Sequence, residues 1–382
     1  MQQRVLRILG TRGVPAAHGG FETFAEQLAL YLVARGWRVV VYCQDEGPAA
    51  LREDRWQGIE RVRIAVPGRG ASSTILFDWK ATLHASSNPD LCLTLGYNTA
   101  VFCALLKLRG IRNIINMDGI EWSRAKWGPL ARTWFRLNEA AGCRLGDHLV
   151  ADHPEIELHL RRQARPDRIS MIPYGADRIS EAPDAPVRAL GLQPGRYLTL
   201  IARPEPENSI LEVVRGFSRR PRGVSLAVLG HYRADDPFHR AVRTAASDEV
   251  LFLGAIYDQE VVSALRVHSL AYVHGHQVGG TNPSLVEALG AGNAVIAHDN
   301  RFNRWAAGEG ARYFQTADEV DALLSDLLLH PAQLDAMRAA SLRRFDCGLH
   351  WSDILASYEA LLVRVAQAAT PGAEGRPAVR SR

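Results

Sequence analysis

The sequence predicts an α/β protein with two doubly wound domains that face a central cleft. Short apolar runs alternate with longer amphipathic segments, which is the pattern of parallel strands covered by helices on both faces. The alternation stops once, at a stretch rich in proline and glycine, and then starts again. The chain has 382 residues, which is long for one domain and sufficient for two.

The first half contains a series of candidate strands and one clear helix. The strand runs are rich in Val, Ile and Leu and are too short for helices. The helix, over residues 23–35, repeats its apolar side chains at helical spacing directly after the first strand. The predicted strands cover residues 5–9, 38–43, 62–66, 91–95, 113–117 and 148–151.

The second half repeats the pattern, and a last amphipathic helix is predicted over residues 352–369. Its predicted strands cover residues 197–202, 225–229, 250–253, 270–274 and 294–297, and its helices residues 210–218, 259–268, 283–290 and 319–329. We therefore divide the chain into Rossmann-like domains at 1–178 and 196–348, a linker at 179–195, a terminal helix at 349–369 and a disordered tail at 370–382.

Composition excludes several classes of protein. Hydrophobic residues make up 47% and charged residues 23%, as in soluble globular proteins, and the net charge of +4 permits an anionic partner without requiring one. No apolar stretch reaches the roughly 20 residues of a membrane span, and no signal peptide is evident, so we expect a cytoplasmic protein. The five cysteines form no C-x-x-C pair, which argues against disulfides and zinc. Nothing indicates a nucleic-acid partner.

A glycine-rich turn, GTRGVPAAHGGFET, connects the first predicted strand to the first helix. Glycines let backbone N–H groups approach an anion, and a helix N-terminus adds the positive end of its dipole. Gly19 and Gly20 are therefore candidate ligands for a pyrophosphate, and a tight structural turn is the alternative. The spacing does not match G-x-G-x-x-G, which disfavours a nicotinamide-dependent oxidoreductase.

A second glycine turn, HGHQVGGTNPSLVEALG, spans residues 274–290 in the second half. Pro283 suits the first helical turn, and Thr281 or Asn282 suits the cap. Glu287 follows about one turn into the helix, where a carboxylate can accept two hydrogen bonds from a ribose; a solvated glutamate is the alternative. The donor-binding residues expected here are Gly280, Thr281, Asn282, Ser284 and Glu287.

Arg203 directly follows the predicted strand 197–202. Ligands of doubly wound sheets bind beyond the carboxyl ends of the strands. A guanidinium stays charged and binds phosphate through two hydrogen bonds, so Arg203 is a candidate for a diphosphate. A surface ion pair is the alternative.

These three motifs resemble the family-4 glycosyltransferases, which have the GT-B fold of two Rossmann-like domains. Gly19, Gly20, Arg203 and Glu287 match the family motifs, and the similarity covers nearly the whole chain. It implies a nucleotide-diphosphate sugar as substrate, no metal ion or other cofactor, and retention of the anomeric configuration. It also implies acceptor binding by residues 1–178, donor binding by 196–348, and a terminal helix that crosses back to the first domain.

Two positions depart from that family. The family's first glutamate, near the sugar, corresponds to Gly279, and its phosphate-binding lysine corresponds to Asn208. Arg203 would therefore carry more of the phosphate charge.

The strings GTRGVPA, GGFETF, NMDGIEWSRAKW and VGGTNPSL resemble a bacterial subgroup identified as rhamnosyltransferases of polysaccharide assembly. That likeness implies dTDP-L-rhamnose as donor and a saccharide on undecaprenyl diphosphate as acceptor. A deoxysugar has one hydroxyl fewer to bind, which is compatible with Gly279. Another UDP- or GDP-sugar as donor, a nucleotide-sugar epimerase and a non-catalytic nucleotide-sugar binder remain alternatives.

Asp118 follows a predicted strand end in the first domain, where family relatives place a polar group beside the donor sugar. It is the candidate catalytic residue together with Arg203, either holding a sugar hydroxyl or acting as a base. An ion pair with Arg124 or Lys126 is the alternative for Asp118 and for Glu121. Further candidates for acceptor or sugar contacts are Tyr97, Asn98 and Glu121.

Aromatic and basic residues interleave after Asp118, a composition that favours contact with a membrane surface. Packing within a helical hairpin explains it equally. Because a lipid-linked acceptor requires membrane contact, we expect the protein at the inner face of the cytoplasmic membrane. The residues are Trp122, Arg124, Lys126, Trp127, Arg132, Trp134, Phe135 and Arg136.

Overall fold

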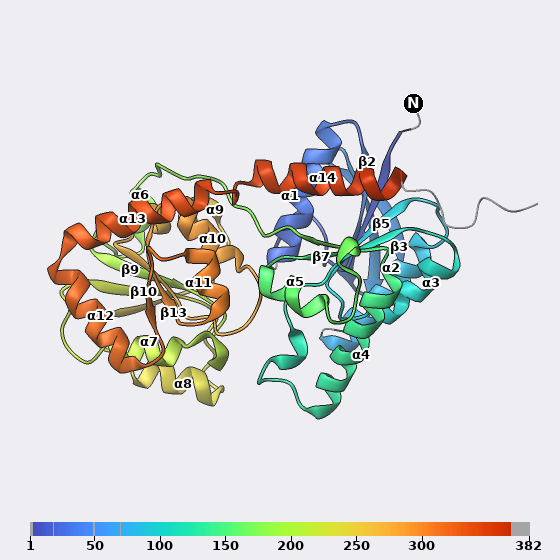
Figure 1. The fold of residues 1–382 in the computed structure, drawn as a ribbon. Helices are drawn as coiled ribbons and strands as arrows, with labels where there is room; N and C mark the ends of the chain where they lie inside the picture. The colour runs from blue at the N-terminus through green and yellow to red at the C-terminus, as the bar shows by residue number, and fades with distance from the viewer. Residues whose placement is uncertain (1–2, 18, 49, 69, 368–382) are drawn as a thin grey trace, which may run out of the picture.

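The computed structural model describes residues 3–17, 19–48, 50–68 and 70–367, so the predicted tail 370–382 lies outside the described residues. The described chain forms two α/β domains, each a sheet with helices packed on it (Figure 1). The predicted α/β fold with two doubly wound domains is confirmed.

The first sheet has the order β3-β4-β2-β1-β5-β6-β7-β8. Every neighbouring pair is parallel except β3 and β4, which are antiparallel. The predicted strands all form, and β3 and β8 are additional. The strands are β1 Val5–Leu9, β2 Arg38–Glu46, β3 Leu51–Trp56, β4 Ile59–Val66, β5 Leu91–Leu95, β6 Asn113–Asn116, β7 His148–Ala151 and β8 Ile169–Met171.

The second sheet is fully parallel, with the order β11-β10-β9-β12-β13-β14. Only β14, of three residues, is additional to the predicted strands. The strands are β9 Tyr197–Ile201, β10 Ser225–Leu229, β11 Val250–Gly254, β12 Ala271–His274, β13 Ala294–His298 and β14 Arg312–Phe314.

Helices connect the strands in both domains, and the short helix α6 forms within the segment predicted as a linker. The helices are α1 Gly20–Ala34, α2 Ala71–Ala85, α3 Cys103–Leu108, α4 Pro129–Leu145, α5 Pro154–Leu160, α6 Ala185–Ala189, α7 Ile210–Phe217, α8 Pro237–Thr244, α9 Gln259–Val267, α10 Pro283–Gly290, α11 Arg301–Ala307, α12 Ala317–Leu329, α13 Pro331–Asp346 and α14 Trp351–Gln367. None of these described helices is both long and apolar enough to cross a lipid bilayer.

Helix α14 follows the second domain in sequence but packs on the first domain (Figure 1). The ring centroids of Phe24 in α1 and Tyr358 in α14 lie 4.6 Å apart. The Asn116 amide, at the end of β6, donates a 2.9 Å hydrogen bond to the Tyr358 hydroxyl. This buried contact joins α14 to the strand that precedes Asp118.

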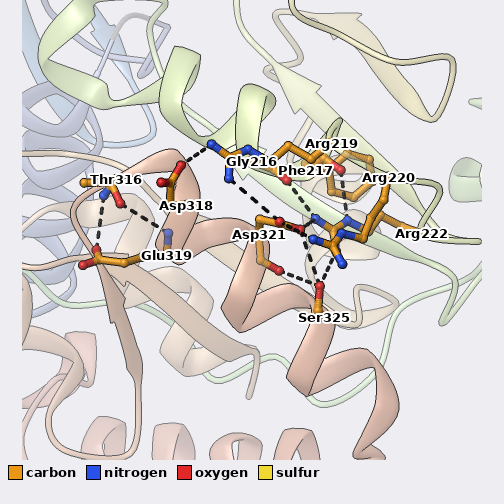
Figure 2. Close-up of polar contacts among 10 residues, drawn as sticks. All are labelled: Gly216, Phe217, Arg219, Arg220, Arg222, Thr316, Asp318, Glu319, Asp321 and Ser325. Carbon is orange, nitrogen blue, oxygen red and sulfur yellow. Dashed lines mark hydrogen bonds and ion pairs between the residues drawn. The ribbon is translucent and has the colours of Figure 1, made fainter.

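A buried arginine fixes α12 to the loop after α7 (Figure 2). The Arg222 side chain is 2% exposed and forms a 2.5 Å ion pair with Asp321. It also donates to the Ser325 hydroxyl at 2.8 Å and to the backbone oxygen of Gly216 at 2.8 Å. This network orders the part of the second domain that is remote from the first domain.

Candidate functional site

The two predicted glycine turns meet where the domains touch. A Cβ atom added to Gly20, the first residue of α1, would lie 2.9 Å from Cγ of Pro283, the first residue of α10. A Cβ atom added to Gly119 would lie 3.1 Å from Cα of Gly279. The amino ends of α1 and α10 are therefore adjacent, and both present the positive ends of their dipoles to the boundary.

The two helix starts differ in how they are capped. Asn282 caps α10, since its side-chain oxygen accepts a 3.0 Å hydrogen bond from the Ser284 backbone N–H. Gly19 has no side chain and so leaves the first N–H groups of α1 without a side-chain cap. Uncapped N–H groups at a helix start are available to an anionic ligand.

Asp118 lies two residues beyond Asn116, the last residue of β6, and its backbone φ angle is 52°. Asp and Asn adopt this left-handed conformation more readily than most side chains. Burial, and then the charge of Glu121, raise the pKa of Asp118 to about 6, although Arg124 and Arg203 act in the opposite direction. Within the described part of the chain, the Asp118 carboxylate has no ion pair with Arg124 or Lys126.

Arg124 joins the two domains through an ion-pair network that the sequence did not reveal. Its guanidinium lies 3.0 Å from the Glu121 carboxylate in the first domain and 2.6 Å from Glu207 Oε1 in the second. The other Glu121 oxygen accepts a 2.9 Å hydrogen bond from the Trp127 indole. Glu121 is thus held by protein groups, as expected from the ion-pair alternative.

Buried polar atoms beside this network lack partners among the described residues. Glu207 is 7% exposed, and its Oε2 atom makes no hydrogen bond. The same holds for Oδ1 of Asn208 and Nδ1 of His276. Because unpaired buried polar atoms are costly, these atoms indicate a place where a ligand or solvent binds.

Arg203 follows β9, with one residue between, and is exposed. Its guanidinium makes no hydrogen bond or ion pair to any residue that the structure describes. Its charge helps to lower the pKa values of Asp118, in the first domain, and His276, in the second. Burial is the larger cause for His276, whose pKa falls to about 3, so that ring is neutral. Arg203 is thus a free cation beside the domain boundary.

Thr281 and Gly280 contact the first domain. The Thr281 backbone N–H donates a 3.1 Å hydrogen bond to Asp152 Oδ2, and its hydroxyl donates to the Asp152 backbone oxygen. Gly280 lies against the same carboxylate. Asp152 directly follows β7 and was not among the predicted site residues.

Glu287 and Ser284 are bonded within the second domain. Glu287 forms an ion pair with the buried Arg266 of α9. The Ser284 hydroxyl lies 2.7 Å from the Tyr272 hydroxyl and accepts a 3.3 Å hydrogen bond from Arg266. The Glu287 carboxylate is therefore held by Arg266, and the Glu287 side chain is 32% exposed.

Tyr97 and Asn98 differ in their access to solvent. Tyr97 is 1% exposed, and its hydroxyl accepts a 2.8 Å hydrogen bond from the Glu121 backbone N–H. Tyr97 therefore holds the Asp118–Glu121 loop through this buried hydrogen bond. Asn98 is exposed, and its backbone oxygen accepts a 2.9 Å hydrogen bond from the Trp134 indole.

The interleaved aromatic and basic residues pack largely on one another. The Arg136 guanidinium lies 4.6 Å from the Trp122 ring centroid, and the Lys126 ammonium lies 4.9 Å from that of Trp127. Trp127 also packs on Phe135, with centroids 5.1 Å apart. The packing alternative therefore accounts for these side chains.

The residues that sequence reasoning missed at the boundary are Asp152, Glu207, His276 and the interdomain role of Arg124. A signal existed for two of them. Asp152 and His276 follow the predicted strands 148–151 and 270–274 by one and two residues, at the ends where ligands bind.

Comparisons with known proteins agree with this architecture. A family model described as a domain of unknown function, DUF1972, matches residues 2–177. Phosphatidyl-myo-inositol mannosyltransferase of Mycobacterium tuberculosis is 30% identical over 205 residues, which are 49% of this chain and 53% of that protein. The chain thus spans about half the length of the curated relatives that it matches.

Solved structures match over almost the whole chain. Sucrose-phosphate synthase of Thermosynechococcus elongatus has a TM-score of 0.80 at 17% identity, covering 96% of this chain and all of that one. Anabaena HepE in complex with UDP has a TM-score of 0.72 at 12% identity, with coverages of 95% and 100%. Trehalose-phosphate synthase of Burkholderia xenovorans has a TM-score of 0.73 at 15% identity, and the match covers 94% of this chain and 100% of that one. The chain therefore has the GT-B fold of two Rossmann-like domains.

Proposed function

We propose that this chain is a GT-B glycosyltransferase that moves a sugar from a nucleotide diphosphate to an acceptor. The observation that carries the proposal is the combination of the adjoining amino ends of α1 and α10 with the unpaired Arg203, whose charge acts on Asp118 and His276 at the same boundary. Together these groups offer positive charge and backbone N–H donors to a diphosphate. The likeness to a mannosyltransferase and to a UDP complex of HepE supports the same reading.

The groups at the boundary suit stabilisation of a departing diphosphate. The backbone N–H groups near Gly19 and Gly20 and the start of α10 are fixed by the fold before any reaction, and Arg203 adds an unpaired positive charge. Preorganised donors of this kind stabilise charge that develops in the transition state. No step requires a metal ion, and metal independence remains a prediction.

Asp118 is the proposed contact to the reacting sugar. With a pKa of about 6 it is mainly ionised at neutral pH and can accept a hydrogen bond from a sugar hydroxyl. We propose retention of the anomeric configuration, in which the leaving phosphate takes the proton of the incoming hydroxyl on the same face. NMR of the product's anomeric proton tests this, and an inverted linkage would instead favour Asp118 as a base.

The proposed donor is dTDP-L-rhamnose, and Glu287 is the proposed ribose ligand. Arg266 holds the Glu287 carboxylate in place, and the Glu287 side chain remains partly exposed. Gly279 offers no side chain to a sugar hydroxyl, which is compatible with a deoxysugar. Another UDP- or GDP-sugar as donor is the alternative within the same proposal.

The proposed acceptor is a saccharide on a lipid carrier, reached at the inner face of the cytoplasmic membrane. Exposed apolar side chains on the first domain support this. Helix α2 exposes Ile75, Trp79 and Leu83 at helical spacing, and α4 exposes Leu130 and Leu137. Sedimentation with anionic lipid vesicles tests membrane contact, with Trp79→Ser as the informative variant.

A thermal-shift panel of dTDP-, UDP- and GDP-sugars tests the central proposal, because a ligand that binds the folded state raises its stability. We expect one nucleotide class to raise the melting temperature. A transfer assay with that donor then separates a transferase from a binder, and donor consumption without acceptor would indicate an epimerase. No shift with any nucleotide sugar would refute the proposal.

A further inference from the structure

Asp152 forms the most direct polar contact between the first domain and the turn of residues 279–282. It is 2% exposed and lies at the carboxyl end of β7. Its Oδ2 atom accepts a 3.1 Å hydrogen bond from the Thr281 backbone N–H, and its backbone oxygen accepts one from the Thr281 hydroxyl. A Cβ atom added to Gly280 would lie 2.0 Å from Oδ1, so the carboxyl group lies directly on the turn.

The second carboxyl oxygen has no partner. Oδ1 is buried and makes no hydrogen bond within the described part of the chain. The ionisable groups that face Asp152 are Asp118 after β6, Tyr174 after β8 and Tyr358 of α14. The adjacent His153 ring is turned away, toward Phe302 and the Glu155 backbone. No cation forms an ion pair with Asp152 among the described residues.

We propose that Asp152 is a positioning residue that holds the 279–282 turn against the first domain as a neutral carboxylic acid, and that its ionisation loosens this contact. The acid form is compatible with the geometry, because Oδ2 accepts from Thr281 and Oδ1 is free to carry the proton. An ionised group would place a charge without a cation partner in a buried site. The inference rests on the proposed function in one respect, which is that the same turn is the proposed donor site.

The direction of the pH effect follows from linkage. Burial, and then the Asp118 charge, raise the pKa of Asp152 to about 8 from the ordinary value of 3.8, although the hydrogen bond from the Thr281 backbone N–H acts in the opposite direction. The docked state therefore binds an extra proton between about pH 4 and about pH 8. The contact is strongest below this range, weakens as pH rises, by at most about tenfold per pH unit, and stays weak above about 8. Ionisation of Asp118, whose pKa is about 6, also weakens the docked state as pH rises, but it does so at lower pH than ionisation of Asp152.

Hydrogen exchange of the 279–282 segment, measured by mass spectrometry on the full chain and corrected for intrinsic rates, tests the proposal between pH 6 and 8. In the wild-type protein, exchange should rise by about tenfold or more across this window. Asp152→Asn should keep the protection seen at pH 6, since an amide oxygen still accepts from Thr281, and should lose the pH dependence. Asp152→Ala should lose the protection at both pH values.

Two further variants guard against misfolding and general charge effects. Thr281→Val removes only the hydroxyl donor and should loosen the turn partially. Asp167→Asn changes an exposed carboxylate of the same domain and should behave as wild type. A pH-dependent rise that persists in Asp152→Asn, or wild-type protection in Asp152→Ala, would overturn the proposal.

Calorimetric titration with UDP, dTDP and GDP separates this inference from the proposed function. If none of these nucleotides binds the wild-type protein, the proposed function fails, and the exchange data still decide the role of Asp152. If a nucleotide binds, Asp152→Ala should bind it about tenfold or more weakly. Equal affinity in that variant would refute the positioning role.

Discussion

Replacing Arg203 with alanine should separate catalysis from stability. The guanidinium is exposed and has no hydrogen bond or ion pair to the described residues, so the free energy of unfolding should change by less than about 0.5 kcal/mol. A lost charge-assisted contact to the leaving group should cost about 2–4 kcal/mol in the transition state. At about 1.36 kcal/mol per factor of ten, kcat/KM should fall by roughly 30-fold to 900-fold.

The assay is release of the nucleoside diphosphate from the donor that the thermal-shift panel selects. Most of the loss should lie in kcat, because the diphosphate charge grows as the bond breaks. Arg215→Ala is the matched control, since Arg215 is an exposed arginine of α7 in the same domain without a side-chain partner among the described residues. Near-normal turnover in Arg203→Ala, or an equal loss in Arg215→Ala, would refute the reasoning.

Three other substitutions test the boundary between the domains. Arg124→Ala leaves Glu121 and Glu207 without their shared cation, so the free energy of unfolding measured in urea should fall by about 3–5 kcal/mol. Adding Glu207→Gln should recover part of that loss. A loss below about 1 kcal/mol would contradict the buried ion pair. Glu287→Gln should weaken nucleotide binding in calorimetry, and unchanged affinity would argue against a ribose contact. In the wild-type protein, kcat/KM should rise with pH around pH 6, because the ionised form of Asp118 is the one proposed to act. Asp118→Asn should remove this rise. A rise that persists in the variant would mean that another group causes it.

Much of the fold could be predicted because apolar runs report buried parallel strands directly. Strands β5 and β7 lie at the predicted residues, since their side chains are buried without exception. Strand β3 escaped prediction because it is an edge strand with mainly exposed, charged side chains. Its stability comes from neighbours, as in the 2.6 Å ion pair between Arg61 and Asp54, and such pairing leaves no apolar pattern in the sequence.

The site could be predicted only where local pattern determines it. Glycine turns between a strand and a helix carry their own signature, and Arg203 stands out because it follows a strand end. The bond between Arg124 and Glu207 joins residues 83 positions apart in different domains. Its existence depends on how the domains dock, which neither periodicity nor spacing reports. The same reason hid the contact between Asp152 and Thr281.

Charge balance at the boundary links these residues to one requirement of the proposed reaction. Arg124 is already bonded to Glu121 and Glu207, whereas the Arg203 guanidinium has no hydrogen bond or ion pair among the described residues. An ionised Asp152 beside the 279–282 turn would repel a diphosphate bound at that turn. An acid kept neutral by burial removes this repulsion while still accepting the Thr281 hydrogen bond. The raised pKa of Asp152 is therefore compatible with anion binding by the second domain, because the neutral carboxyl group holds the turn without adding negative charge beside it.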